Sequence, residues 1–468
     1  MPKTHYKTKR GAFTIDLDRM PQEERAVGEI AATAHAIAAF YGFERMRIAP
    51  MESATSFAPL VRAGFMDARQ PVLCTMDTGE EALLCFSAGL GVVRAYFSHH
   101  MQDLPHPVKI VAEADTYALA QKKGKESGRA EKRVPDDEGV AVEEDAPYAM
   151  RREWALVMMG EDSLIAEAEI IQVIWKACAE LGLAYDAVEL KINATGCAQC
   201  RGPFRSALGA YLRARATRLC VASRRDLKSR PARILACTDE RCRGIAEAAP
   251  QVLDFLCDRC KKQLRTLLEF LDEARVPYFL DPTLFGEGSW FGEIMFVVAV
   301  RSEEIMLRFD GAPGASPDDE RGRRAPIVIA EGGRMSRAAQ ALGGKELAVA
   351  TGTLFLDIIA DEMQKRLGGA VIATDVFLIQ LGELAKRKSL EILEVLREAE
   401  VDVKESLGRD SIKIQLKIAE RVGARYALVL GQKEALDATI IVRETGSGIQ
   451  ETVPQEKLIE FLKKKLKK

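Results

Sequence analysis

Seven of the ten cysteines lie close together in the chain, from Cys197 to Cys260, and their spacing suits metal binding. Two pairs have the form Cys-x-x-Cys, Cys197 with Cys200 and Cys257 with Cys260. Such a pair places two thiolates on one turn of chain, each able to bind one tetrahedral zinc ion at about 2.3 Å. The two pairs together would complete a zinc site with four sulfur ligands.

The other three cysteines of this stretch, Cys220, Cys237 and Cys242, could form part of a second metal site. A disulfide framework is disfavoured because seven is an odd number and because the chain has the character of a cytoplasmic protein. The alternative is a module that has lost its metal and packs its cysteines as small apolar side chains. Redox catalysis is not expected, since no thioredoxin-like strand accompanies either Cys-x-x-Cys pair. We therefore expect structural zinc.

The same stretch is rich in arginine, whose planar guanidinium group suits phosphate oxygens. The arginines are Arg201, Arg205, Arg213, Arg215, Arg218, Arg224, Arg225, Arg230, Arg233, Arg241 and Arg243. We take Arg201, Arg205, Arg224 and Arg225 as candidate RNA-binding residues. The alternative is a solvated helix face whose arginines pair with nearby acidic side chains.

Hydrophobic patterns around the cysteine module predict the elements that must position it. A helix is expected over residues 21–43 and another over 163–181, and extended runs at 71–77, 81–87 and 106–114 predict strands of one sheet. A further helix is expected to begin near Gly352. From residue 371 onward strands alternate with helices, which predicts an α/β domain with a mostly parallel sheet.

Composition limits the classes of protein that the chain can form. Its 468 residues suffice for two to four domains, and 47% hydrophobic and 29% charged residues are typical of a soluble globular protein. A net charge of -2 excludes a uniformly basic nucleic-acid binder but allows a local basic surface. No apolar run reaches membrane-spanning length, and the N-terminus lacks a secretory h-region. We expect a cytoplasmic protein without a membrane partner.

Several segments carry a resemblance to a known family. "KINATGCAQCRGPFRSALGAYL", "RPARILACTDERC", "AAPQVLDFLCDRC" and "VPYFLDPTL" resemble the insertion region of bacterial histidyl-tRNA synthetases, which are class II aminoacyl-tRNA synthetases. "AFYGFERMRIAPMES" and "VVRAYFSHHMQDLPHPVKI" resemble segments of the family's catalytic domain. The segment from "SIKIQLKIAERVGARYALVLGQ" onward resembles its anticodon-binding domain. The resemblance covers most of the chain.

The resemblance implies a fold and its division into domains. We expect an α+β core with a class II antiparallel sheet, formed by residues 1–195 and 276–366. A Cys-rich, mainly helical domain is inserted at 196–275, and an α/β anticodon-binding domain is expected at 370–468. Because class II cores of this type associate through the catalytic sheet, the resemblance also implies a homodimer.

The chain departs from the family where histidine and ATP should bind. Before "VVRAY" the family has an arginine, a glutamate and a threonine that hold these substrates, and this chain has Cys85, Ser87 and Gly89. Four further positions have lost the side chains that the reaction needs; they are held by Ala118, Ala120, Gly286 and Phe355. Arg151 and Arg152 are the nearest substitutes for the lost arginine of the second motif. Ser223 replaces a cysteine of the insertion, which weakens a second metal site.

Three functions are compatible with these residues. The first is a non-catalytic protein that binds tRNA or a tRNA-like RNA, with Gly431, Gln432, Glu434 and Arg443 facing anticodon bases; the alternative for these four is an ordinary turn and strand surface. The second is an active histidine–tRNA ligase with an unusual site, which would need ATP and magnesium. The third is a regulatory or scaffolding subunit of another enzyme.

Overall fold

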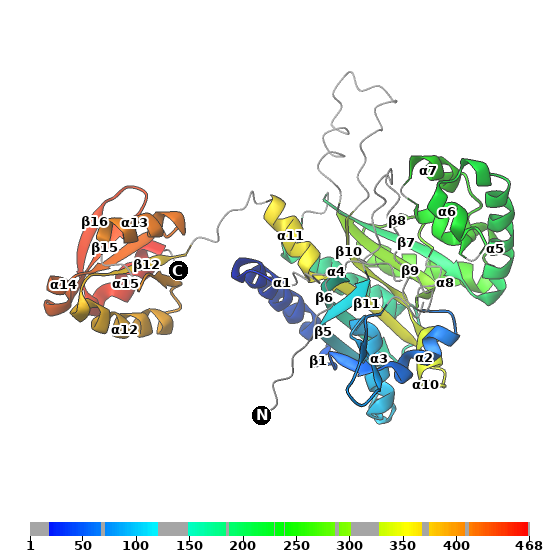
Figure 1. Cartoon of the computed structure of the whole chain (residues 1–468), viewed down its shortest axis with the longest axis horizontal. Coiled ribbons are helices and arrows are strands. Elements are labelled where there is room, and N and C mark those ends of the chain that lie inside the picture. Colours follow the sequence, from blue (N-terminus) through cyan, green and yellow to red (C-terminus); the bar gives the residue numbers. More distant parts are fainter. Residues whose placement is uncertain are drawn as a thin grey trace, which may run out of the picture. The chain divides into compact units, whose positions relative to one another are not determined.

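The structure, a computed structural model, describes residues 18–66, 71–119, 148–183, 187–228, 230–237, 239–285, 290–300, 327–366, 374–407 and 411–466 (Figure 1). These residues group into two compact units, Met1–Met363 and Gln364–Lys468. Within the described part of the chain, no helix combines the length and apolar character needed to cross a bilayer.

An eight-stranded sheet forms the centre of the first unit. Its strands lie in the order β1, β5, β6, β11, β10, β9, β7, β8. All neighbours are antiparallel except the two outermost pairs, β1 with β5 and β7 with β8, which are parallel. The predicted antiparallel core is confirmed. The bounds are Glu44–Met46 for β1, Val108–Leu119 for β5, Tyr148–Met159 for β6, Val349–Phe355 for β11, Ile327–Arg334 for β10, Gly292–Val300 for β9, Val188–Gly196 for β7 and Phe279–Leu280 for β8.

A second, three-stranded sheet corrects one prediction. Strands β2 (Met51–Ser53), β4 (Glu81–Leu84) and β3 (Leu73–Thr75) pair only with one another, in the order β2, β4, β3. The runs at 71–77 and 81–87 were expected to share a sheet with the strand after residue 106. They do not, because both edges of β4 are occupied by β2 and β3, whereas β5 pairs with β1 and β6.

Helices cover both faces of the large sheet (Figure 1). Alternate residues of β6 point to opposite faces, and they enter two different cores. Trp154, Leu156 and Met158 pack with helices α1 (Pro21–Phe40) and α4 (Ile165–Glu180). On the opposite face, Ala155 and Val157 pack with the helices α3 (Ala88–Ser98), α10 (Ser336–Gly343) and α2 (Ala54–Arg62).

The segment around Gly352 is a strand, and the prediction of a helix beginning there is wrong. The helix α11 (Leu356–Arg366) begins four residues later, after β11. A Cβ atom at Gly352 would lie 2.5 Å from Ile170 and 2.6 Å from Ile174 of α4. The glycine therefore lets the sheet approach α4 closely, a tertiary requirement that a local helical pattern does not reveal.

The Cys-rich insertion connects β7 to β8 and is mainly helical, as predicted. It shares a hydrophobic core with the α1/α4 face of the sheet, through residues such as Phe204, Leu208 and Leu267. Its elements are α5 (Ala198–Arg213), η2 (Ala216–Arg218), α6 (Val221–Asp226), η3 (Pro231–Ala236), α7 (Glu240–Glu247), η4 (Val252–Phe255) and α8 (Asp258–Glu273).

The second unit is a five-stranded sheet with helices and its own hydrophobic cores. The strand order is β13, β12, β14, β15, β16. Only β13, β12 and β14 are parallel neighbours; β15 and β16 are antiparallel, so the predicted mostly parallel sheet is mixed. The elements are β12 (Val376–Gln380), α12 (Glu383–Glu398), β13 (Val403–Glu405), α13 (Ile412–Arg421), β14 (Tyr426–Leu430), α14 (Gln432–Leu436), β15 (Thr439–Glu444), β16 (Gln450–Pro454), η5 (Gln455–Lys457) and α15 (Leu458–Leu466).

Candidate functional site

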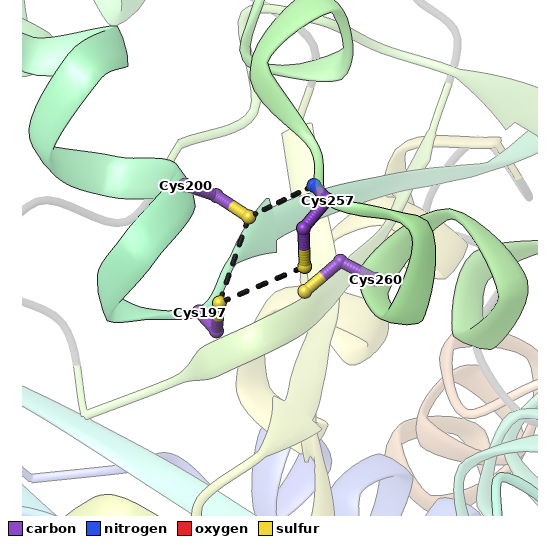
Figure 2. A group of neighbouring side chains, drawn as sticks. All are labelled: Cys197, Cys200, Cys257 and Cys260. Atoms are coloured by element: carbon purple, nitrogen blue, oxygen red, sulfur yellow. Dashed lines mark hydrogen bonds between the residues drawn. The ribbon is translucent and has the colours of Figure 1, made fainter.

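The two Cys-x-x-Cys pairs meet in space (Figure 2). The Sγ atoms of Cys197, Cys200, Cys257 and Cys260 all lie within 4.8 Å of one another. Cys197 Sγ is 3.6 Å from Cys200 Sγ and 4.0 Å from Cys257 Sγ. Four sulfur atoms bound to one tetrahedral zinc ion would lie about 3.8 Å apart, given zinc–sulfur distances of about 2.3 Å. The spacing therefore fits a four-sulfur metal site.

Helix beginnings position these cysteines. Cys197 and Cys257 are the N-cap residues of α5 and α8, so the second cysteine of each pair lies in the first turn of its helix. The Cys257 N–H donates to Cys200 Sγ over 3.2 Å. Burial raises the pKa of the Cys197 thiol, but hydrogen bonds from the backbone of Cys200 and Gln199 and from the Cys200 and Cys260 side chains together lower it to about 7. The pKa of Cys257 is lowered as well, so the thiolate, the form that binds metal, is favoured at the two N-cap cysteines, whereas burial raises the pKa of Cys200 and Cys260.

Gly196 makes the turn that brings β7 into the metal cluster. Its φ is +73°, which side chains rarely allow, and an added Cβ would lie 2.6 Å from the Cβ of Cys200. The Gly-Cys-x-x-Cys sequence is therefore one structural unit, in which the glycine frees the space that Cys200 fills.

The remaining cysteines form the second predicted cluster. The Sγ atoms of Cys220, Cys237 and Cys242 also lie within 4.8 Å of one another. Cys220 Sγ is 3.8 Å from Cys237 Sγ. Sequence spacing thus assigned all seven cysteines to their correct groups, because short helices hold each group together.

Arg201, one of the predicted RNA-binding arginines, also makes hydrogen bonds within the protein. Its Nε donates to the carbonyl oxygen of Gly196 over 2.9 Å, and its Nη2 donates to Thr195 Oγ1 over 2.9 Å. Burial lowers the pKa of Arg201 to about 10. The guanidinium group thus ties α5 to the end of β7, which gives Arg201 a structural role, and its contact with RNA stays a prediction.

The other three arginines of that set are solvent-exposed, Arg205 on α5 and Arg224 and Arg225 on α6. They lie in a domain of opposite charge to the rest of the chain: residues 196–275 contain 17 lysines and arginines against nine acidic residues, a net charge of +8, whereas the whole chain carries -2. Nearby, the Arg215 guanidinium lies 3.8 Å from the Tyr211 ring centroid, so aromatic and cationic groups alternate here. Such a surface can attract polyanions.

In the second unit, the predicted RNA-facing residues do not form one group. Gly431 is buried, and its N–H donates to Glu434 Oε2 over 3.1 Å, so this pair begins α14. Gln432 is exposed beside them. Arg443 pairs with Ala427 near the opposite end of β14. Ala427 precedes Gly431 by four residues, which at about 3.3 Å per residue is about 13 Å along the strand. Gly431 and Glu434 therefore have structural roles, and Gln432 and Arg443 lie at different ends of the sheet.

Cys85, Ser87 and Gly89, where the resemblance led us to expect substrate-binding residues, lie at or just before the beginning of α3. Ser87 Oγ accepts the Leu90 N–H over 3.3 Å as an N-cap. The Ala88 N–H donates to Glu153 Oε2 over 2.8 Å. A Cβ on Gly89 would lie 3.1 Å from Thr351 Oγ1, a tight contact for any larger residue. Cys85 is buried, and burial raises its pKa to about 12, so it is a neutral thiol.

The same face of the sheet carries carboxylates that sequence reasoning did not identify. Glu153 accepts a hydrogen bond from Thr116 Oγ1 over 3.1 Å in addition to that from Ala88. Burial raises the pKa of Glu153 to about 7, and the nearby Glu331 raises it further. Burial also raises the pKa of Glu331. The only sequence signal for these buried carboxylates was that Glu153 and Glu331 alternate with apolar residues in strands β6 and β10.

Phe355 and Arg151 occupy the end of this face where the resemblance places an arginine over adenine. The Arg151 guanidinium lies 5.1 Å from the Phe355 ring centroid. A purine stacked between the guanidinium group and the ring would need these two groups to be about 7 Å apart, two layers at about 3.5 Å each. The observed 5.1 Å leaves no room for a purine between them. Arg152, the other suggested substitute, is bound to Asp115 over 2.9 Å and to Glu24 over 2.6 Å. Ala118 is exposed near the end of β5, and Ala120 and Gly286 lie outside the described residues.

The described cavity beside Cys85 and Ser87 is very small. Its volume is about 10 Å³, and Glu52, Phe57 and Leu83 also line it. Glu52 is itself bound by Arg94, whose Nη2 donates to Glu52 Oε1 over 3.0 Å. A cavity of this size holds at most one water molecule. The side chains at this point fill the space with neutral groups and one internal ion pair.

Comparisons with known proteins agree with this architecture. Residues 375–465 match the family described as "Anticodon binding domain". The chain is 26% identical over 464 residues to the histidine–tRNA ligase of Dehalococcoides mccartyi, covering 98% of this chain and 100% of that protein. It is 31% identical over 314 residues to the histidine–tRNA ligase of Halothermothrix orenii, covering 65% of this chain and 68% of that protein.

Two solved structures share the fold. The apo histidyl-tRNA synthetase of S. aureus gives a TM-score of 0.65 at 19% identity, covering 99% of this chain and 100% of that one. The second is a Bacillus halodurans protein described as an ATP phosphoribosyltransferase regulatory subunit/histidyl-tRNA synthetase. It gives a TM-score of 0.57 at 13% identity, covering 90% of this chain and 99% of that one. The antiparallel core and the C-terminal domain thus define a class II aminoacyl-tRNA synthetase fold. The chain belongs to the histidyl-tRNA synthetase family.

Proposed function

We propose that this chain is a non-catalytic member of its family that binds tRNA or a tRNA-like RNA. The observation that carries the loss of catalysis is the replacement of charge on the face that would hold ATP. Adenylate formation requires cations against the α-phosphate and pyrophosphate. Here the described part of that face carries Glu153 and Glu331, and Phe355 is covered by Arg151.

The size of the loss supports the same conclusion. Removing one preorganised interaction with a developing charge costs about 3 to 4 kcal/mol, or about 10²- to 10³-fold in rate. Several such interactions are replaced at once, and their effects are not additive. A carboxylate near a triphosphate adds repulsion. Turnover at a useful rate is therefore not expected.

ATP–pyrophosphate exchange with histidine tests this proposal. The purified chain should exchange at least about 10⁴-fold more slowly than the histidine–tRNA ligase of D. mccartyi, because two or more such interactions are missing. That relative is the positive control for the assay. Stoichiometric histidyl-adenylate formed by this chain, free of contaminating synthetase, would overturn the proposal and favour an active ligase that uses ATP and magnesium.

RNA binding is supported by the charge of the insertion and by the anticodon-binding domain. Filter binding of bulk tRNA at several salt concentrations tests it. Replacing Arg224 and Arg225 by alanine should weaken binding and lower the salt slope by roughly one for each phosphate that is no longer neutralised. The matched control replaces Lys176 and Lys345, which are exposed on the domain that holds the large sheet, by alanine. This control should leave both the tRNA affinity and the salt slope unchanged. Equal effects of the two double variants would reject the insertion as the binding surface.

A regulatory or scaffolding role is the second candidate. It is favoured by a fold shared with the B. halodurans protein, whose description includes a regulatory subunit. In that case native purification should yield a second polypeptide at fixed stoichiometry, and tRNA binding should be weak. A homodimer remains part of either proposal. Strand β1 lies at the sheet edge, where its backbone could pair with a second chain, and Phe40 at the end of α1 is 86% exposed and could be covered by it.

We also propose that the four-sulfur cluster holds a structural zinc ion. Cys197, Cys200, Cys257 and Cys260 would bind it, and the ion would hold the starts of α5 and α8 together. Zinc supplies no reaction there, because four thiolates leave it no open position. Metal analysis should find that the zinc content falls by one ion per chain when Cys200 is replaced by alanine. Equal zinc in this variant and in the unaltered chain would contradict the assignment.

A further inference from the structure

The hydroxyl group of Ser223 lies inside the second cysteine cluster. Ser223 Oγ is 3.2 Å from Cys220 Sγ and 3.4 Å from Cys242 Sγ. Ser223 and Cys242 are 4% and 0% exposed, so this polar group is withdrawn from bulk water into a pocket of sulfur atoms. A buried hydroxyl normally has a partner of matching polarity. Neutral thiols are weak partners, and a bound cation would be a strong one.

The distances fit a metal with three sulfur ligands and one oxygen ligand. For tetrahedral zinc, with about 2.3 Å to sulfur and about 2.0 Å to oxygen, neighbouring sulfur atoms are about 3.8 Å apart and sulfur and oxygen about 3.5 Å. The distance from Cys220 Sγ to Cys237 Sγ is 3.8 Å, and the two sulfur–oxygen distances are 3.2 and 3.4 Å. The first cluster shows the same sulfur spacing, 3.6 to 4.0 Å.

Backbone N–H donors also hold two sulfur atoms of this cluster in place. The Ser223 N–H donates to Cys220 Sγ over 3.3 Å, and the Cys220 N–H donates to Cys242 Sγ over 3.3 Å. The first cluster has the equivalent bond, from the Cys257 N–H to Cys200 Sγ over 3.2 Å. Donors of this kind orient the sulfur atoms and delocalise the charge of a metal–thiolate group. Both clusters are therefore built alike.

We propose that Cys220, Cys237, Cys242 and Ser223 form a second metal site, which binds a zinc-type divalent ion through three sulfur atoms and the serine oxygen. The sequence predicted that a serine in place of a cysteine weakens this site, and the proposal keeps that expectation while giving the serine oxygen a place among the ligands. A neutral hydroxyl donates less charge than a thiolate, so the second ion is held less tightly than the first. The two sites share no ligand, which makes them independent in occupancy.

Metal stoichiometry and release kinetics of the full-length chain test the proposal. Chain purified under reducing conditions and supplied with Zn²⁺ should contain two zinc ions, and EDTA should remove one quickly and the other slowly. X-ray absorption should give about 3.5 sulfur atoms per zinc, the mean of four and three. One ion per chain would overturn the proposal, as would two ions lost at one rate.

Variants of Ser223 identify the oxygen ligand. Ser223→Cys should raise the sulfur number to about four and slow the fast release, whereas Ser223→Ala should accelerate it by at least about 10-fold. Cys200→Ala, which supplies no ligand atom in place of the sulfur, is the control and should remove only the slow ion. If Ser223→Ala left the fast phase unchanged, the oxygen would not be a ligand.

A measurement on the unaltered chain covers the case in which variants fold poorly. Zn²⁺ should protect Cys220, Cys237 and Cys242 from alkylation, as detected by peptide mass spectrometry, and EDTA should expose them before Cys197 and Cys257. Alkylation that is unaffected by zinc, or a disulfide recovered between Cys220 and Cys237 under reducing conditions, would contradict the proposal.

Discussion

Glu153 lies where strand β6 meets the first turn of α3, and both of its carboxylate oxygens accept hydrogen bonds, from Ala88 and from Thr116. An acid at a helix N-terminus is favourable, but this one is also buried and close to Glu331. The residue therefore links β6 to α3 and β5, and under the proposed loss of catalysis it would also repel a triphosphate. A scaffold can keep its fold while its substrate site changes character in this manner.

Replacing Glu153 by glutamine should change how stability depends on pH. Burial raises the pKa of Glu153 from its ordinary 4.5 to about 7. A raised pKa means that the folded chain binds the extra proton, so this residue's stabilising contribution is complete below about pH 4.5 and is lost as pH rises through 7. Glu153→Gln keeps acceptor and donor atoms in place and removes that loss, which is at most about 3 kcal/mol. Thermal unfolding at pH 5 and pH 8 measures the difference.

The control for this prediction is Glu180→Gln, since Glu180 is an exposed acid on α4. It should leave the pH profile of the unaltered chain in place. The prediction is wrong if Glu153→Gln loses as much stability between pH 5 and pH 8 as the unaltered chain does.

The buried ion pair of Arg334 and Glu167 gives a second prediction at this scale. The two residues are 5% and 1% exposed, and Arg334 Nη2 donates to Glu167 Oε2 over 2.7 Å. Arg334→Met would leave a buried carboxylate without its partner and should cost about 3 to 5 kcal/mol. Arg334→Met combined with Glu167→Leu should cost much less, because both charges are removed. Urea unfolding measures the free energy of unfolding of the single and double variants. A double variant that is no more stable than the single variant would contradict this account.

At the scale of elements, sequence spacing predicted what short segments determine. Both cysteine groups came from spacing, and in the first group the reason is that each Cys-x-x-Cys pair spans one helix start. The partition of strands between two sheets was not predictable, since it depends on which edge of β4 each neighbour occupies. The strand at Gly352 was missed because the glycine is needed for close packing against α4, which lies about 180 residues earlier in the chain. Local patterns identify elements, and pairing partners require the folded chain.

Metal removal should act on the insertion as a unit. The two cysteine clusters lie among α5, α6, α7 and α8, and α6 and α7, with six and eight residues, are too short to be stable on their own. Chelation should therefore lower the helical signal in circular dichroism and weaken tRNA binding, because exposed arginines such as Arg224 and Arg225 lose their fixed positions. Added Zn²⁺ should restore both.

Cys74→Ser is the control for chelation, because Cys74 lies outside both clusters. This variant should respond to EDTA as the unaltered chain does, whereas Cys200→Ser should already show part of the loss. If EDTA removed the metal but left tRNA binding unchanged, the insertion would not be the metal-dependent RNA surface.

At the scale of the whole molecule, two separately folded units carry the features expected to contact RNA. Each has its own hydrophobic core, and the +8 charge of residues 196–275 contrasts with -2 for the whole chain. The remainder is therefore acidic, which confines nonspecific attraction to limited surfaces. A tRNA bound by both units would be held by two modest binding surfaces joined in one chain.

Joining these surfaces should raise affinity well above that of either unit. We expect the full chain to bind tRNA at least about 100-fold more tightly than residues 1–366 or residues 371–468 alone, because the second binding event becomes intramolecular. Mixing the two fragments should not restore the affinity, which serves as the control. A tRNA acceptor-stem hairpin without the anticodon arm should bind the full chain and residues 1–366 equally. If deleting residues 371–468 left full-length tRNA binding unchanged, the anticodon-binding domain would have no part in recognising RNA, and a scaffolding role would be favoured.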